Sequence, residues 1–158
     1  MEEEKRYYIT KEGLVKIKKE YEDLKKVKLL KTKGDVPRVL QSEDLNAEYL
    51  SFQEDMGFLD SKITELEYIL KNMEIIKTPH KDKQGFIGLG ATVFVDVGGQ
   101  SDEFTIIGTL EANPALGKIS NESPVGRALL GHKVGELVSV SSPVETIYKI
   151  KKIKYHIG

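Results

Sequence analysis

The sequence predicts an α+β protein: an N-terminal antiparallel coiled-coil hairpin of two helices, then a small antiparallel β domain with one short helix. Three observations support this fold class. Apolar residues recur at spacings of three and four in the first half of the chain. They alternate at a spacing of two in the second half. Charged residues make up 31% of the chain, which suits a long solvated segment beside a compact core.

The first helix is predicted to begin after Thr10, a candidate N-cap. An apolar stripe then follows at alternating spacings of three and four: Leu14, Ile17, Tyr21 and Leu24. Lys28 occupies the next seam position, so the stripe weakens there. Gly34 and Pro37 are expected to end or bend this helix.

The second helix has the clearer pattern, a heptad seam held over about four heptads. Its members are Leu45, Tyr49, Phe52, Met56, Leu59, Ile63, Leu66, Leu70 and Met73. So narrow a seam requires a helical partner, and the short connection to the first helix permits only an antiparallel hairpin. If the arms are level at Thr10 and Ile75, the chain reverses near Ser42 and Glu43. Arms of roughly 30 residues would place that reversal about 45 Å from the base of the hairpin.

Charge is divided between the two predicted arms. Acids dominate residues 43–74, where Lys62 and Lys71 are the only bases. Bases dominate residues 1–33, with Lys16, Lys18, Lys19, Lys25, Lys26, Lys28, Lys31 and Lys33. We interpret this division as interhelical pairing plus a solvated face. The alternative is a basic face that lies along an anionic channel.

The β domain follows a polar linker. The predicted domains are a hairpin over residues 1–78, a linker over 79–84 and the β domain over 85–158. Period-two patterns predict strands at Ala91–Val97, Glu103–Ile107, Glu136–Val140 and Thr146–Ile153. A Gly98-Gly99 turn is expected to join the first two strands. Between the second and third strands, Ser123 as N-cap and Pro124 at the first helical position predict a short helix that stops at Gly131.

Bulk composition excludes several classes of function. The net charge of −1 predicts neither strong nucleic-acid binding nor membrane attraction. The absence of cysteine excludes thiolate chemistry and disulfides, and fits a reducing compartment. The polar start MEEEKRYY is unlike a signal peptide, and no run approaches 18 apolar residues. We expect a soluble, cytoplasmic monomer with no membrane partner.

Self-contained catalysis is not indicated either. The three histidines are scattered without metal-ligand spacing, and no serine lies in a G-x-S-x-G motif. The run GFIGLG at 85–90 opens a strand rather than a helix and lacks the GK[ST] ending of a phosphate loop. Glu43 and Asp44 at the predicted reversal remain. A carboxylate pair on a projecting rod has no pocket, so it would have to complete the site of a partner.

Five motifs carry a resemblance to a known family. They are ITKEGL at Ile9–Leu14, NAEY at Asn46–Tyr49, Gly57-Phe58, GATV at Gly90–Val93 and ISNESPVGRALLGHKVGE at Ile119–Glu136. Together they resemble the Gre family of bacterial transcript cleavage factors, in the same order and over nearly the whole chain. The resemblance implies an antiparallel coiled coil followed by an FKBP-like domain.

The resemblance also implies a transcription elongation factor that binds RNA polymerase. The FKBP-like domain would dock at the rim of the secondary channel, and the coiled coil would enter it. Glu43 and Asp44 would then help to hold the catalytic Mg²⁺ of the polymerase, so that backtracked nascent RNA is cut near its 3′ end. The factor itself would be no enzyme and would have no cofactor of its own. It would meet nascent RNA and DNA indirectly, through the elongation complex.

The acidic tip departs from the family pattern. The family has two more residues between its acidic turn and NAEY, so Asp44 matches the family's Asp and Glu43 is the nearest substitute for its missing Glu. The match gives Asn46, Glu48 and Tyr49 the role of tip support. The alternative for the acids is a favourable interaction with a helix N-terminus.

The same match assigns a polymerase-docking loop in the β domain. Its residues are Asn121, Glu122, Ser123 and Pro124. The alternative is that Ser123 and Pro124 only begin a helix, and one residue can do both.

Two other functions stay open at this stage. The altered tip is compatible with an inhibitor that binds the secondary channel without stimulating cleavage. The FKBP likeness raises a prolyl isomerase, with the candidate pocket aromatics Phe86, Phe94, Phe104 and Tyr148. Alternating strand positions, however, explain these aromatics as core residues, and we expect no isomerase activity.

Overall fold

The computed structural model describes residues 5–34, 47–141 and 144–156. Its contacts divide the chain into two compact units. We call Leu14–Asn72 the hairpin unit, and Met1–Gly13 with Met73–Gly158 the sheet unit. The predicted domain boundaries at residues 78 and 84 stay predictions.

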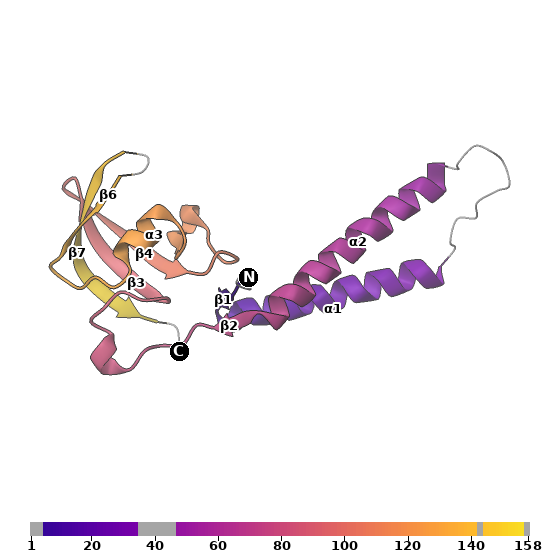
Figure 1. Ribbon diagram of the computed structural model, residues 1–158, viewed down its shortest axis with the longest axis horizontal. Helices are drawn as coiled ribbons and strands as arrows, with labels where there is room; N and C mark the ends of the chain where they lie inside the picture. Colours follow the sequence, from indigo (N-terminus) through magenta and orange to yellow (C-terminus); the bar gives the residue numbers. More distant parts are fainter. Residues whose placement is uncertain (1–4, 35–46, 142–143, 157–158) are drawn as a thin grey trace. The chain divides into compact units, whose positions relative to one another are not determined.

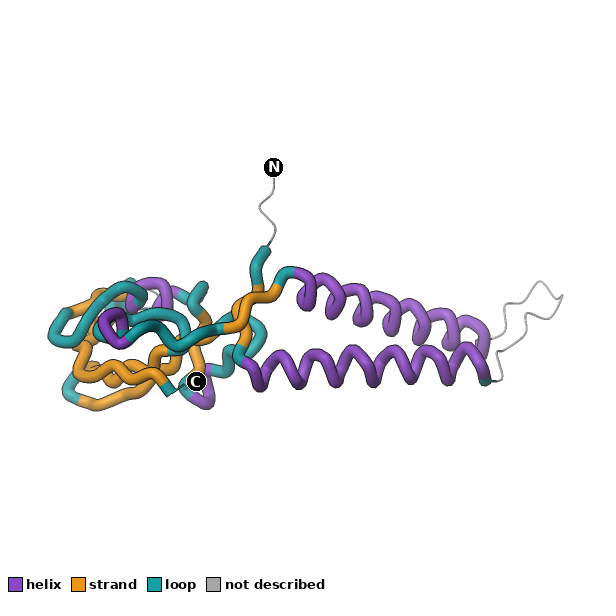
Figure 2. Tube along the Cα trace, turned by 90° about the horizontal axis from the view of Figure 1, so that it is seen from below, coloured by secondary structure: helices purple, strands orange, loops and turns teal. Residues whose placement is uncertain are grey.

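The hairpin unit consists of α1 (Lys11–Lys33) and α2 (Ala47–Lys71), which run side by side (Figures 1 and 2). Leu59 and Leu66 of the predicted seam are buried, and Ile69 is buried as well. The helical hairpin and the α+β fold class are therefore confirmed. The helices have 23 and 25 residues. At 1.5 Å per residue they measure about 35 and 38 Å, which is shorter than the predicted arms.

Both helices end near residues that favour an end. The helical hydrogen bond from the Gly34 N–H to the Leu30 carbonyl, at 2.9 Å, stands at the end of α1, which stops at Lys33 as Gly34 predicted. Pro37 lies outside the described residues. α2 ends at Lys71, and the prediction that its seam continues to Met73 is wrong. The Asn72 side chain donates to the Tyr68 carbonyl at 2.9 Å and competes with the helical bonds there.

Beyond this helix end the chain becomes extended. β2 (Met73–Ile75) pairs in parallel with β1 (Tyr7–Ile9), so that Ile9 lies opposite Ile75. The Ile76 N–H continues this pairing with a 2.9 Å bond to the Ile9 carbonyl. Neither strand was predicted, because three residues show no periodicity.

The main sheet of the sheet unit has the strand order β5-β4-β3-β7-β6. Its strands are β3 (Ala91–Val97), β4 (Gln100–Ile107), β5 (Lys118–Ser120), β6 (Leu137–Val140) and β7 (Thr146–Tyr155). β4 and β5 are parallel, and the other neighbours are antiparallel. The sheet is therefore mixed, where the sequence predicted an antiparallel one. The short β5 is the strand that the periodicity did not indicate.

Three short helical segments accompany this sheet: η1 (Lys81–Lys83), η2 (Pro114–Leu116) and α3 (Pro124–Leu129). The predicted turn between β3 and β4 is confirmed. Gly98 and Gly99 both have positive φ, 56° and 81°, as tight hairpin turns require. The core lies between one face of the sheet and α3. It contains Ile87, Ala91, Val93, Val95, Ile106, Ile119, Leu129, Val138, Val140 and Ile150.

No described helix is both long enough and apolar enough to span a bilayer.

Candidate functional site

The predicted tip acids, Glu43 and Asp44, lie outside the described residues, as does Asn46. The structure instead describes the two helices on either side of this segment. α1 reaches Lys33 and α2 resumes at Ala47. The roles assigned to these three residues stay predictions.

The other two predicted tip residues lie in the first turn of α2. Glu48 is exposed, and as an acid near a helix N-terminus it interacts favourably with the helix dipole. Tyr49 is half-buried, and its hydroxyl accepts a 3.0 Å hydrogen bond from Gln53 one turn later. The seam position predicted for Tyr49 explains its partial burial. That these residues support a tip stays a prediction.

Two ion pairs join α1 to α2. Lys28 lies 2.5 Å from Asp60, and Lys31 lies 3.1 Å from Asp55. Both lysines continue the seam spacing of Leu24, so charged side chains replace apolar ones toward this end of α1. The predicted interhelical pairing is confirmed for these two lysines.

A third cross-link lies nearer the base of the hairpin. The Tyr21 hydroxyl donates to Glu67 at 2.9 Å, and the Lys25 ammonium lies 4.9 Å from the centre of the Tyr21 ring. The hydrogen bond to Glu67 raises the pKa of Tyr21, because the carboxylate needs the phenolic proton.

The predicted docking loop is a turn braced by Ser120 and Ser123. The Ser123 hydroxyl donates to the Ser120 carbonyl at 2.6 Å and accepts from the Gly126 N–H at 3.1 Å. Ser123 is thus the N-cap of α3, as predicted, with Pro124 in the first turn. The Glu122 N–H also donates to the Ser120 hydroxyl at 3.0 Å.

This loop has little freedom to move. A side chain at Gly126 would overlap the Ser120 carbonyl, so the start of α3 packs tightly on the loop. The Asn121 N–H donates to Ile107 in β4 at 2.9 Å. Glu122 and Pro124 are exposed on this rigid turn. The turn therefore presents Glu122 and Pro124 from a backbone held by hydrogen bonds.

Glu111, which the sequence did not indicate, caps the N-terminus of α1. Its carboxylate accepts from the Thr10 N–H at 2.8 Å and from the Thr10 hydroxyl at 2.5 Å. The Thr10 hydroxyl in turn accepts from the Gly13 N–H at 3.0 Å. In a capping box, a Glu or Gln at position 13 would make the bond to Thr10 N–H. Gly13 occupies that position and has no side chain. This was the one local indication that another part of the chain supplies the capping carboxylate.

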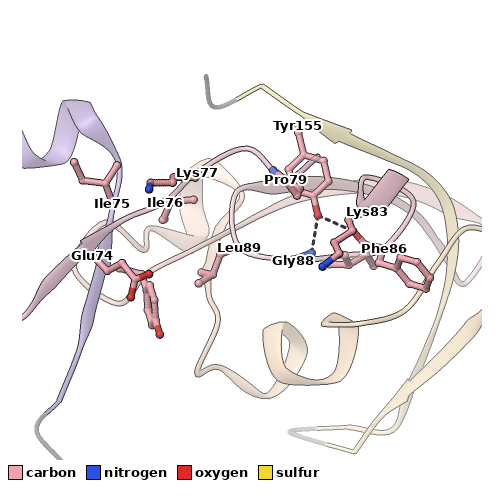
Figure 3. Close-up of a pocket in the computed structure, with 12 residues that line it drawn as sticks. Glu74, Ile75, Ile76, Lys77, Pro79, Lys83, Phe86, Gly88, Leu89 and Tyr155 are labelled. Carbon is pink, nitrogen blue, oxygen red and sulfur yellow. Dashed lines mark hydrogen bonds between the residues drawn. The ribbon is translucent and has the colours of Figure 1, made fainter. Parts of the chain in front are cut away.

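A cavity of about 410 Å³ also lies in the sheet unit (Figure 3). Apolar groups of Ile76, Pro79 and Leu89 contribute to its lining, together with Tyr155. The Tyr155 hydroxyl donates to the Phe86 carbonyl at 2.6 Å and accepts from the Gly88 N–H at 2.9 Å. Burial raises the pKa of Tyr155. This hydroxyl therefore holds residues 86–88 on β7.

The four candidate isomerase aromatics do not gather at this cavity. Phe86 lines it, whereas Phe104 and Tyr148 pack edge to face against the core with ring centres 6.0 Å apart. Phe94 pairs with Glu103, the residue before Phe104, so Phe94 and Phe104 lie on opposite faces of the sheet. This arrangement does not favour a proline-binding pocket built from all four.

Within the described residues, no group of three or more His, Asp or Glu side chains is arranged to hold a metal ion.

Comparisons with known protein families cover nearly the whole chain. A model described as "Transcription elongation factor, N-terminal" matches residues 7–75. A model described as "Transcription elongation factor, GreA/GreB, C-term" matches residues 81–155.

Similar proteins include several named transcription elongation factor GreA. The protein of Thermomicrobium roseum is 39% identical over 145 residues, covering 88% of this chain and 90% of its own. That of Lactococcus lactis subsp. cremoris strain SK11 is 40% identical, covering 95% and 99%. That of Bacillus subtilis is 39% identical, covering 97% and 99%.

Similar solved structures include the GreA factor homolog 1 of Thermus thermophilus, with 25% identity, coverage of 95% and 99%, and a TM-score of 0.42. A GreA/GreB factor of Nitrosomonas europaea has 17% identity, coverage of 96% and 99%, and a TM-score of 0.44.

Proposed function

The chain belongs to the GreA/GreB family of transcription elongation factors, and from this membership we propose that it stimulates the cleavage of backtracked nascent RNA by RNA polymerase. In this proposal the hairpin unit enters the secondary channel of the polymerase, in the cytoplasm. The factor acts as a monomer, and the polymerase remains the enzyme. RNA and DNA are met through the elongation complex.

The register of the hairpin is the observation that carries this proposal. Tyr21 contacts Glu67, Lys28 contacts Asp60, and Lys31 contacts Asp55. The midpoints of these pairs in the sequence fall at residues 44, 44 and 43. If both helices continued at this register, the chain would reverse at these positions. The register therefore supports Glu43 and Asp44 as the residues carried at the far end of the hairpin.

The chemistry of these two residues fits the proposed task. Mg²⁺ prefers hard oxygen ligands, and carboxylates supply them with compensating charge. Such ions in a polymerase steady the attacking and leaving oxygens of the phosphodiester. Asp44, with Glu43 beside it, would add ligands to a loosely held ion and orient or deprotonate the attacking water.

The braced loop of α3 is the proposed docking surface. Its exposed residues, Glu122 and Pro124, stand on a backbone that the bonds of Ser120 and Ser123 hold, so the backbone costs little further entropy on binding a partner. Ser123 would then serve both as helix cap and as part of the surface. Glu122→Lys is expected to weaken binding to the polymerase, whereas Glu145→Lys, on an exposed acid before β7, is the matched control.

Stalled elongation complexes with a label at the RNA 3′ end test the cleavage proposal. Addition of the wild-type factor is expected to release short 3′ fragments. Glu43→Ala and Asp44→Ala are each expected to remove this release, because each variant lacks a carboxylate at the proposed tip. Glu54→Ala, which removes an exposed acid from α2, should leave the release unchanged.

Other outcomes favour the other hypotheses. Slowed RNA synthesis without fragments would indicate a channel-binding inhibitor instead. Fragments that persist in both tip variants would contradict the role of the acids. Acceleration of cis–trans exchange in a proline peptide would support an isomerase, and we expect none.

A further inference from the structure

The segment at residues 8–13 and the turn at residues 108–111 lie far apart in the sequence but pack closely against each other. Glu111 and Thr10 are 101 positions apart, yet the Glu111 carboxylate accepts both the N–H and the hydroxyl of Thr10. In the turn before Glu111, a side chain at Gly108 would overlap the Tyr8 carbonyl. The turn at residues 108–111 therefore packs directly on the segment that leads into α1.

The space beside Gly13 is filled by the same carboxylate. The three heavy atoms nearest to a Cβ placed at Gly13 are the Oε1, Cδ and Oε2 atoms of Glu111. Gly13 is buried, although it lies in the first turn of a helix. The Glu111 carboxylate thus occupies the position that a capping side chain on residue 13 itself would take.

The contact between Glu111 and the first turn of α1 lies next to the boundary between the two units. Gly13 is the last residue of the first segment of the sheet unit, and the hairpin unit begins at Leu14. α1 continues without interruption from one unit into the other. The carboxylate that binds Thr10 therefore acts on the first turn of a helix that continues into the hairpin unit.

We propose that Glu111 is a positioning residue for transcript cleavage: it limits the motion of the hairpin unit at its base, so that the tip acids are delivered to a defined place. This inference rests on the proposed function. A cap made within α1 itself would stabilise the helix equally well, but it would not join α1 to the turn at residues 108–111. The two roles can therefore be separated by moving the carboxylate.

The separating variants are Glu111→Ala, and Glu111→Ala combined with Gly13→Glu. The double variant recreates a capping box, Thr10-x-x-Glu, within α1 and leaves it unconnected to residue 111. The three heavy atoms nearest to a Cβ at position 13 all belong to Glu111, so their removal relieves the closest contacts of the new side chain. Glu111→Ala with Gly13→Ala is the matched control without a carboxylate. If Glu111→Ala does not fold, the double variant still carries the test.

The polymerase-independent measurement is the distribution of distances between spin labels on the two units. The chain has no cysteine, so Ser61→Cys in α2 and Ser139→Cys in β6 give unique labelling sites, and both serines are exposed. We expect a narrow distribution with Glu111 present and a broader one in Glu111→Ala. The double variant should stay broad although its melting temperature exceeds that of the matched control. A wild-type distribution as broad as that of Glu111→Ala, or a double variant as narrow as the wild type, would overturn the proposal.

The cleavage assay gives the functional measurement, at concentrations of factor below saturation. Glu111→Ala and the double variant should both release 3′ fragments about tenfold more slowly than the wild type, since misplaced groups lose rate steeply. Full recovery in the double variant would show that local capping suffices and would refute the positioning role. If the wild type releases no fragments, the proposed function fails, while the distance measurement still judges the restraint.

Discussion

Gly13 lacks a side chain because a neighbour occupies the space, and its backbone conformation does not require glycine. Its φ is not among the positive values that other glycines of the described chain adopt. Glycine in a helix costs about 0.5–1 kcal/mol relative to alanine. The sequence accepts that cost because the carboxylate of Glu111 binds Thr10 at the same place.

Gly13→Ala is expected to lower the melting temperature. The Cβ would displace the Glu111 carboxylate and weaken its bonds to Thr10, and a hydrogen bond to a charged group contributes about 1.5–3 kcal/mol. This loss exceeds the gain in helix propensity. In a Glu111→Ala background the same substitution should raise the melting temperature. Gly57→Ala in α2, where nothing lies within 4 Å, should raise it in both backgrounds, as thermal circular dichroism can show.

Glu136 gives the sheet unit a pH dependence. The hydrogen bond from His132, at 2.5 Å, holds the pKa of Glu136 below its usual 4.5. A lowered pKa in the folded state gives stability above the unfolded pKa, and this stability is lost as the pH falls through the folded value. The melting temperature of the wild type should exceed that of Glu136→Gln at neutral pH. The difference should shrink below pH 4.5. A constant difference would contradict this explanation.

At the scale of elements, α1 and α2 are matched by two kinds of contact. Buried side chains of α2 such as Leu59 and Leu66 fill the seam, and ion pairs join the helices where the apolar stripe of α1 ends after Leu24. The weakening of the apolar stripe at Lys28 is therefore a change of contact type within one continuous pairing. The two helices therefore stay paired beyond Leu24 through charged side chains.

A double-mutant cycle on Lys28 and Asp60 tests this pairing. Both side chains are partly exposed, so their coupling should be small, roughly 0.2–1 kcal/mol. It should fall further in high salt, because solvent-exposed charges are screened. The cycle is measured by urea unfolding of the alanine variants. The same cycle on Lys26 and Asp60 is the control, and a coupling of equal size there would contradict a specific pair.

At the scale of the whole molecule, the main core of the sheet unit is contained in the C-terminal half of the chain. Its buried members run from Ile87 to Ile150. Ile9 and Ile76 are also buried, at 0% and 5% exposure, but they lie in or beside the small β1–β2 pair. Residues 1–13 thus belong to the sheet unit but contribute no side chain to its main core.

A fragment of residues 79–158 is therefore expected to fold by itself. Its thermal unfolding should be cooperative, because the core residues and the β5-β4-β3-β7-β6 order are all retained. Its melting temperature should lie several degrees below that of the sheet unit in the full chain, since Ile9 and the Thr10–Glu111 bonds are lost. Circular dichroism and backbone amide spectra check both points. A fragment without cooperative unfolding would show that residues 1–13 are required for the core.

The sequence predicted the docking loop and the tip acids with different success. Ser123 and Pro124 were correctly predicted to begin a helix, because a cap acts on atoms three residues away. Glu43 and Asp44 were indicated by the midpoint between the two predicted helices and by the family resemblance. Their role stays a prediction. Both residues lie outside the part of the chain that the structure describes.

The sequence by itself determined the elements whose signals are local: the heptad seam of α2, the alternating β3 strand, the Gly98-Gly99 turn and the capped α3. Each of these depends on side chains within a few positions of one another. Only the tertiary structure decided the parallel β1–β2 pair, the parallel β5 and the cap of α1 by Glu111. A three-residue strand shows no period, and a carboxylate 101 positions from the helix it caps leaves no local trace. Such contacts depend on how the chain folds back on itself.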